Sequence, residues 1–189
     1  MIVYGGERMS KNVLVISTSL RKNSNSEQLA AAFAEGAREA GHEVEVLSLR
    51  DKTLGFCRGC LACQKTLQCV IKDDANDIVE KIGKADVLVF ATPIYYYEMC
   101  GQLKTLLDRA NPLFPTDYAF RDIYLLATAA DEESSAVDGA RKGLEGWVAC
   151  FSKARLTDVL FCGGVTNAGD IDGNTALAKA RKLGSSVGL

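Results

Sequence analysis

The chain has 189 residues, of which 48% are hydrophobic and 24% charged, and its formal net charge at pH 7 is −2. This composition is ordinary for a globular domain, and the absence of a basic block argues against a nucleic-acid partner. No apolar run approaches the roughly 20 residues that span a bilayer, and residues 1–10 lack the apolar core of a secretory signal. We therefore expect a cytoplasmic protein with no membrane partner.

The length predicts one domain at residues 11–189, after a flexible N-terminal lead-in at residues 1–10. Apolar, β-branched runs predict five buried strands, and apolar residues at helical spacing predict helices between them. In chain order, we expect strands at 12–18, 42–49, 86–92, 122–128 and 157–163. The intervening helices present apolar faces within 29–37, 78–82, 103–110 and 136–151, and a last helix covers 174–187.

Buried strands that alternate with helices are typical of a parallel sheet covered on both faces. Right-handed crossovers then give an α/β three-layer sandwich, with a five-stranded parallel sheet of order 2-1-3-4-5. Such sheets bind ligands beyond the carboxyl ends of their strands, where the strand order reverses. The candidate loops are therefore residues 17–26, 92–101 and 128–134.

The first loop combines hydroxyls, amides and cations with a helix N-terminus, which favours an anion. It contains neither GxGxxG nor GxxxxGK[ST], so a terminal phosphate suits it better than a dinucleotide or a triphosphate. The alternative for Ser24 is helix capping, because Ser24 and Glu27 have the spacing of a capping box.

The second loop carries Tyr95, Tyr96 and Tyr97 after Pro93, and an aromatic run at a strand end can wall a flat heterocycle. Packing in a dimer interface is the alternative for these tyrosines. The third loop begins with Thr128 and Ala129, whose small side chains would let a flat ring approach the backbone. A plain helix N-terminus is the alternative for that loop.

These loops carry a resemblance to a known family. Residues 19–26, SLRKNSNS, resemble the phosphate loop of the NADPH-dependent FMN reductase family, and residues 92–97 with 101–109 resemble its isoalloxazine loop and following helix. The match covers roughly residues 12–184 and implies a flavodoxin-like fold that binds FMN. It implies phosphate contacts from Ser19, Arg21, Asn25 and Ser26, and ring contacts from Pro93, Ile94, Tyr95 and Tyr96. Cys100 departs from the family, where serine is more common.

Four of the seven cysteines crowd a loop at residues 53–72: Cys57, Cys60, Cys63 and Cys69. Their spacing is closer to a ferredoxin-type run than to the paired motifs of a zinc ribbon. The motif resembles that of iron-sulfur flavoproteins, which implies that these four residues are ligands of a 4Fe-4S cluster. Zinc, and thiols without a metal, are the alternatives.

The expected function is that of an FMN-dependent NAD(P)H oxidoreductase, which passes a hydride from NAD(P)H to FMN and electrons on to a small-molecule acceptor or a redox protein. The alternative is an iron-sulfur flavoprotein that relays electrons between ferredoxin-like donors, a 4Fe-4S cluster and FMN. His42, the one histidine, is expected at the surface, which argues against a serine hydrolase. A response-regulator-like module is disfavoured because residues 13–18 and 87–92 contain no acid. The tyrosine-rich and cysteine-rich loops favour a homodimer or homotetramer.

Overall fold

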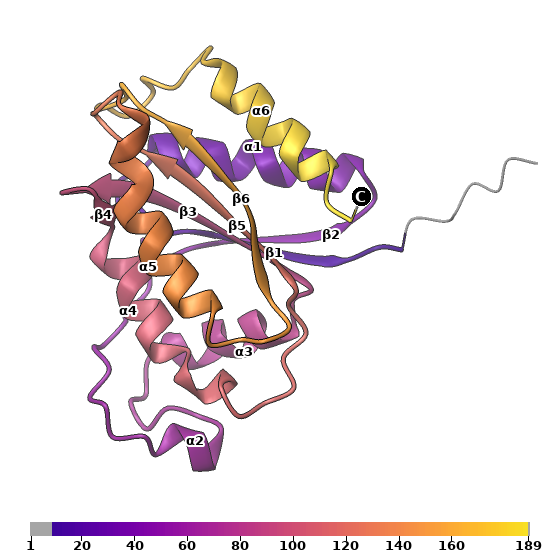
Figure 1. Ribbon diagram of the computed structural model, residues 1–189, viewed down its shortest axis with the longest axis vertical. Coiled ribbons are helices and arrows are strands. Elements are labelled where there is room, and N and C mark those ends of the chain that lie inside the picture. Colours follow the sequence, from indigo (N-terminus) through magenta and orange to yellow (C-terminus); the bar gives the residue numbers. More distant parts are fainter. Residues whose placement is uncertain (1–8, 189) are drawn as a thin grey trace, which may run out of the picture.

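The computed structural model describes residues 9–188, so most of the expected lead-in lies outside the described residues. Five parallel strands form the sheet in the order β2-β1-β3-β5-β6 (Figure 1). Their bounds are β1 (Asn12–Ser17), β2 (Glu43–Ser48), β3 (Val87–Tyr95), β5 (Asp122–Thr128) and β6 (Arg155–Cys162). Because β5 and β6 are the fourth and fifth predicted strands, the predicted α/β sandwich and strand order are confirmed.

Helices cover both faces of the sheet (Figure 1). One face carries α1 (Asn25–Glu39) and α6 (Thr175–Ser185), and the other carries α3 (Ala75–Lys84), α4 (Gly101–Arg109) and α5 (Asp138–Val148). Successive residues of β1 point alternately toward the two helical layers. Val15 packs in the cluster beneath α1 and α6, whereas Ile16 packs in the cluster beneath α3, α4 and α5.

Two glycines allow α1 and α6 to pack with their backbones in close contact. A Cβ atom on Gly36 would lie 1.9 Å from the carbonyl oxygen of Arg181, and one on Gly184 would lie 2.0 Å from that of Phe33. No larger residue fits at either position. This packing holds α1 against α6, and the N-terminus of α1 lies at the carboxyl ends of the strands.

The structure adds elements that the hydrophobic pattern does not predict. A short strand, β4 (Glu98–Met99), pairs antiparallel with the end of β3. The long helix expected at residues 136–151 is divided into a 3-10 turn, η2 (Ser134–Val137), and α5. Two further short elements, α2 (Cys63–Thr66) and η1 (Asn111–Leu113), lie in the cysteine loop and after α4.

The surface position expected for His42 is wrong. Its side chain is buried at 5% exposure, because both ring nitrogens have backbone partners. The Lys11 N–H donates to Nδ1 at 3.2 Å, and Nε2 lies 3.0 Å from the carbonyl oxygen of Val187. His42 therefore joins the start of the sheet to the C-terminal segment.

Within residues 9–188, every helix is too short or too polar to cross a lipid bilayer.

Candidate functional site

The carboxyl ends of β1, β3 and β5 meet at one edge of the sheet, around a hollow of about 170 Å³. The hollow brings together every residue of the predicted flavin site except Tyr96. It also takes in four residues outside that set: Ser24, Ala130, Val165 and Thr166. Loops that are far apart in the sequence thus form one binding surface at the point where the strand order reverses.

The loop between β1 and α1 provides the polar floor of this hollow. Ser19, Ser24 and Ser26 are all buried, and Ser24 is the N-cap of α1, with its hydroxyl accepting a bond from the Glu27 N–H at 3.2 Å. The capping interpretation of Ser24 is therefore confirmed. The first-turn N–H groups of α1 have no carbonyl one turn earlier to bond, and they carry the positive end of the helix dipole. This floor can bind an anion.

The hydroxyl of Ser17 is a further unsatisfied group at this edge. It ends β1, its side chain is buried, and no hydrogen-bond partner for its Oγ exists among residues 9–188. A buried hydroxyl without a partner costs roughly 1–3 kcal/mol. Ser17 is not among the residues that line the hollow.

The loop after β6, at residues 163–174, forms a wall of the hollow that sequence reasoning missed. Arg21 Nη1 donates to the carbonyl oxygen of Thr166 at 2.6 Å. The Asn25 side chain donates to the carbonyl oxygen of Asn167 at 2.9 Å and accepts from the Ile171 N–H at 3.3 Å. The Asn25 side chain therefore holds this wall. The backbone N–H of Asn25, in the first turn of α1, is a separate donor that can bind an anion. The pair Gly163 and Gly164, directly after a strand, is the sequence feature that indicates a sharp turn here.

Asp170, in the same loop, stabilises this wall. Asp170 Oδ2 accepts from the N–H groups of Thr166 and Asn167, at 2.9 and 2.7 Å. The Asn167 N–H, and next the Thr166 N–H, lower the pKa of Asp170 below its usual value. The carboxylate therefore remains charged at neutral pH and fixes the turn that presents the Thr166 carbonyl to Arg21.

A tight hairpin links β3 to β4 and carries the tyrosines. Tyr95 pairs with Glu98, so the loop consists of Tyr96 and Tyr97, with φ values of 50° and 63°. Two-residue loops with positive φ usually contain Asn or Gly, and bulky residues in this region are strained. Tyr95 lines the hollow, whereas Tyr96 is fully exposed outside it. Figure 1 shows this hairpin projecting at the edge of the molecule beside α4 and α5.

Tyr97 connects the hairpin to the loop after β5. Its hydroxyl donates to Asp131 Oδ2 at 3.1 Å, and this hydrogen bond raises the pKa of Tyr97. Thr128, Ala129 and Ala130 precede Asp131 and line the hollow with small side chains. The bond therefore joins the two loops between which the sequence predicts a flat ring.

Cys100 lies behind this site, not in it. Its sulfur is 3.1 Å from Thr18 Oγ1, and its N–H donates to Thr92 Oγ1 at 3.2 Å. The thiol is buried at the N-cap of α4 and is not among the residues that line the hollow. Cys100 thus ties the ends of β1 and β3 to the start of α4.

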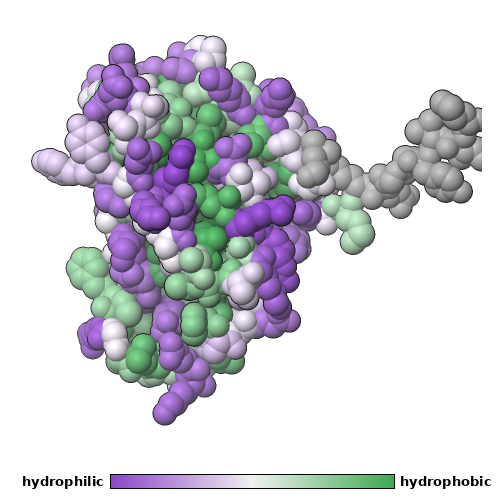
Figure 2. All heavy atoms as spheres, viewed as in Figure 1, coloured by the Kyte–Doolittle hydropathy of each residue, from purple (hydrophilic) through white to green (hydrophobic). Residues whose placement is uncertain are grey.

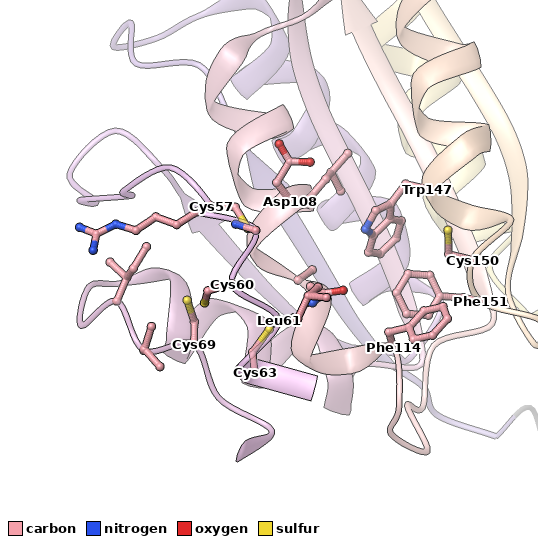
Figure 3. A pocket seen from close by; sticks show the side chains of 17 residues that line it. Cys57, Cys60, Leu61, Cys63, Cys69, Asp108, Phe114, Trp147, Cys150 and Phe151 are labelled. Atoms are coloured by element: carbon pink, nitrogen blue, oxygen red, sulfur yellow. Dashed lines mark hydrogen bonds between the residues drawn. The ribbon is translucent and has the colours of Figure 1, made fainter. Parts of the chain in front are cut away.

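A second hollow, of about 450 Å³, lies between the cysteine loop and the ends of α4 and α5. All four motif cysteines line it, and so does Cys150 from the end of α5. Figure 3 shows Cys57, Cys60, Cys63 and Cys69 on one side of this hollow, with Trp147 and Phe151 on the other. The sequence places Cys150 apart from the motif, and only the fold shows that it shares the same space.

Two of the motif sulfurs accept hydrogen bonds from N–H groups. Asn111 Nδ2 donates to Cys63 Sγ at 3.1 Å, and the Gly59 N–H donates to Cys57 Sγ at 3.4 Å. Four soft thiols around one cavity fit the chemistry of an iron-sulfur cluster or a thiophilic metal. Their arrangement in the structure does not fit such a group, because no three His, Cys, Asp or Glu side chains within residues 9–188 converge to hold a metal ion.

A buried ion pair anchors both ends of the cysteine loop. Arg109 Nη1 and Nη2 lie 2.7 and 2.8 Å from the two carboxylate oxygens of Asp73. The same guanidinium donates to the carbonyl oxygens of Gly55 and Ile71, at 2.7 and 3.2 Å. Burial opposes ionisation of Asp73, but bonds from Arg109 and from the Gly55 and Ala75 N–H groups lower its pKa overall. Residues 55 and 71 are thereby held against the end of α4.

Sequence comparison places the chain among flavoproteins. A model of the NADPH-dependent FMN reductase family matches residues 11–151. An iron-sulfur flavoprotein of Methanocaldococcus jannaschii is 38% identical over 101 residues, which are 53% of this chain and 52% of that protein. An iron-sulfur flavoprotein of Methanosarcina thermophila is 36% identical over 107 residues, 57% of this chain and 56% of that protein. The chain thus spans about half the length of the curated relatives it matches.

Solved structures support the fold. An NAD(P)H:quinone oxidoreductase from Methanothermobacter marburgensis matches with a TM-score of 0.71 at 21% identity, over 94% of this chain and 99% of that one. An azoreductase from Bacillus anthracis matches with a TM-score of 0.70 at 18% identity, over 94% and 99%. At these identities the likeness establishes the flavodoxin-like architecture alone. The family match covers most of the chain, and this protein therefore belongs to the NADPH-dependent FMN reductase family.

Proposed function

We propose that this chain is an FMN-dependent NAD(P)H oxidoreductase, with FMN in the hollow at the carboxyl ends of β1, β3 and β5. One observation carries the proposal: the hollow joins an anion-binding helix N-terminus to a small-residue loop and an aromatic hairpin. A phosphate and a flat ring on the same molecule would satisfy both parts. When bound, FMN supplies hydride acceptance from NAD(P)H and electron delivery to an acceptor.

The roles of the residues follow from their positions. The N–H groups at the start of α1 and the hydroxyls of Ser19 and Ser26 would bind the phosphate, with Arg21 adding positive charge at the rim. Pro93, Ile94 and Tyr95 would contact one side of the ring, and Thr128 with Ala129 would allow its close approach on the other. Tyr96, outside the hollow, would contact the electron acceptor or a second subunit.

Turnover by the purified chain tests this proposal. We expect oxidation of NADH or NADPH to require added or retained FMN and an acceptor such as a quinone. No stimulation by FMN in the wild-type chain would overturn the proposal.

A second candidate function is electron relay between ferredoxin-like donors, a 4Fe-4S cluster and FMN. The specific observation in its favour is the single hollow lined by Cys57, Cys60, Cys63 and Cys69, with N–H donors on two of their sulfurs. The curated relatives named as iron-sulfur flavoproteins support the same reading. Anaerobic purification should then give about four irons per chain, together with inorganic sulfide. Iron-free protein after anaerobic reconstitution would remove this candidate.

We also propose a homodimer or homotetramer. Two groups of exposed apolar and aromatic side chains support it: the hairpin tyrosines, and Phe56, Leu61, Leu67 and Val70 of the cysteine loop. Figure 2 shows hydrophobic residues at the surface of the end of the molecule where Figure 1 places α2. Exposed patches of this kind mark contact surfaces. Light scattering at several concentrations measures the mass, and a monomer throughout would contradict the assignment.

A further inference from the structure

Three buried polar side chains meet behind the flavin hollow, between the ends of β1 and β3: Thr18, Thr92 and Cys100. Thr18 and Thr92 have no exposed surface, and Cys100 is 1% exposed. Thr18 directly precedes Ser19, on the floor of the hollow, and Thr92 directly precedes Pro93 of the tyrosine hairpin. Each threonine therefore lies one residue behind a loop of the proposed flavin site.

Hydrogen bonds join these three side chains into one chain. The Thr92 hydroxyl donates to Cys100 Sγ at 3.4 Å and accepts from the Cys100 N–H at 3.2 Å. Cys100 Sγ lies 3.1 Å from Thr18 Oγ1, and the Thr18 hydroxyl donates its one proton to the carbonyl oxygen of Ala91 at 3.0 Å. The thiol is therefore the donor to Thr18 and the acceptor from Thr92. A single sulfur links the end of β1 to the end of β3.

Helix capping is the alternative role for Cys100, because this residue occupies the N-cap of α4. Within residues 9–188, however, no side chain at this position bonds the first N–H groups of the helix. The sulfur bonds the two strand ends instead. The geometry thus favours a link between the strands over a helix cap.

We propose that Cys100, Thr18 and Thr92 are positioning residues for flavin, and that their linked side chains set the spacing between the phosphate loop and the ring loop. This inference rests on the proposed FMN site and goes beyond it, because none of the three side chains lines the hollow.

The physical reason is that FMN carries its phosphate and its ring on one molecule. Both loops can bind it at full strength only at one separation, and supporting side chains must hold such contacts within about 0.5 Å. A ligand that touches one loop alone does not depend on the spacing. Loss of the link should therefore weaken FMN binding more than the binding of either part.

Three ligands test this inference on the purified chain: FMN, riboflavin, which lacks the phosphate, and inorganic phosphate. Cys100→Ala removes both sulfur bonds. We expect the dissociation constant for FMN to rise about tenfold, which corresponds to the loss of one to two ordinary hydrogen bonds. The constants for riboflavin and phosphate should stay as in the wild-type chain. Quenching of flavin fluorescence measures the two flavins, and competition with FMN measures phosphate.

Two further variants separate hydrogen bonding from packing. Cys100→Ser keeps a donor and an acceptor at this position and should bind FMN like the wild-type chain. Thr18→Val removes the hydroxyl, but the Ala91 carbonyl oxygen still accepts from the Thr18 N–H at 2.9 Å. Thr18→Val should also weaken FMN binding, and it carries the test if Cys100→Ala fails to fold. The double variant should be no weaker than Cys100→Ala alone, because both changes break the same link.

Cys162→Ala is the matched control. Cys162 is also buried, at 4% exposure, but its sulfur donates to the carbonyl oxygen of the next residue, Gly163, at 3.8 Å. The substitution removes the same side-chain atoms as Cys100→Ala without touching the link between β1 and β3. FMN binding should be unchanged in this variant.

The outcomes distinguish this inference from the proposed function. Equal FMN affinity in the wild-type chain, Cys100→Ala and Thr18→Val would overturn the inference and leave the FMN site standing. An equal loss for FMN and riboflavin, or a serine variant as weak as the alanine variant, would also overturn it. A wild-type chain that binds no FMN would overturn the proposed function itself.

Discussion

The guanidinium of Arg21 donates to the carbonyl oxygen of Thr166 at 2.6 Å, so the loops that follow β1 and β6 meet at the rim of one hollow. This contact gives the proposed phosphate site a cation that is fixed by the backbone. The floor of the site consists of neutral N–H and hydroxyl groups. Arg21 therefore contributes the charge, and α1 contributes the geometry.

The first prediction concerns Arg21→Gln. A hydrogen bond to a charged group is worth about 1.5–3 kcal/mol, so the dissociation constant for FMN should rise roughly 10- to 100-fold. Riboflavin, which lacks the phosphate, should bind both proteins equally. Quenching of flavin fluorescence on titration measures both constants. An equal loss for the two flavins would mean that Arg21 acts only by holding the Thr166 loop.

Two glycines of α5 give a paired test of how the hairpin is held. A Cβ atom on Gly139 would lie 2.3 Å from the Tyr97 carbonyl oxygen, whereas one on Gly146 would meet nothing within 4 Å. Gly139→Ala should therefore cost about 1–3 kcal/mol of unfolding free energy and weaken flavin binding. Gly146→Ala should stabilise the exposed helix by up to about 1 kcal/mol. Urea unfolding measures both, and destabilisation of equal size in the two variants would refute the close contact.

The strained hairpin gives a prediction on function. Replacing Tyr96 and Tyr97 by Asn and Gly supplies the residues that prefer positive φ, while the bond to Asp131 is lost. We expect a net gain of about 1 kcal/mol in stability, because each strained residue costs of order 1–3 kcal/mol. Acceptor reduction should slow at the same time. Greater stability with an unchanged rate would show that the tyrosines have no part in the reaction.

Much of this fold could be predicted because its strands are buried on both faces. Runs such as residues 86–92 have no polar alternation, so their pattern indicates a parallel sheet. The order of the strands places the loops at residues 17–26, 92–101 and 128–134 at one edge, and the structure brings residues from all three around one hollow. The choice of loops followed from topology, whereas the contacts assigned to individual residues came from the family resemblance.

Other features depend on contacts that no local pattern encodes. β4 forms although Tyr96 and Tyr97 are poor residues for its turn, because α5 and Asp131 hold the hairpin. His42 is buried because two distant backbone groups satisfy its ring. The wall at residues 163–174 reaches the site through Arg21 and Asn25, whose partners lie more than a hundred residues away in the sequence.

The Asp73–Arg109 pair predicts a pH dependence. The pKa of Asp73 is lowered in the folded chain, so its stabilisation is present above the unfolded pKa of about 4 and is lost as pH falls through the lower folded value. Asp73→Asn leaves Arg109 buried without its counter-charge and should cost roughly 3 kcal/mol at pH 7. The two proteins should converge as pH falls below the lowered folded pKa of Asp73. Unfolding followed by Trp147 fluorescence across this range measures the difference, and a gap independent of pH would refute the assignment.

A crystal structure of the chain with FMN tests the central claim most directly. The account predicts the phosphate against residues 19–26 at the start of α1, with the ring between Pro93–Tyr95 and Thr128–Ala129. Flavin bound elsewhere, or a hollow that holds no flavin at saturating FMN, would contradict it.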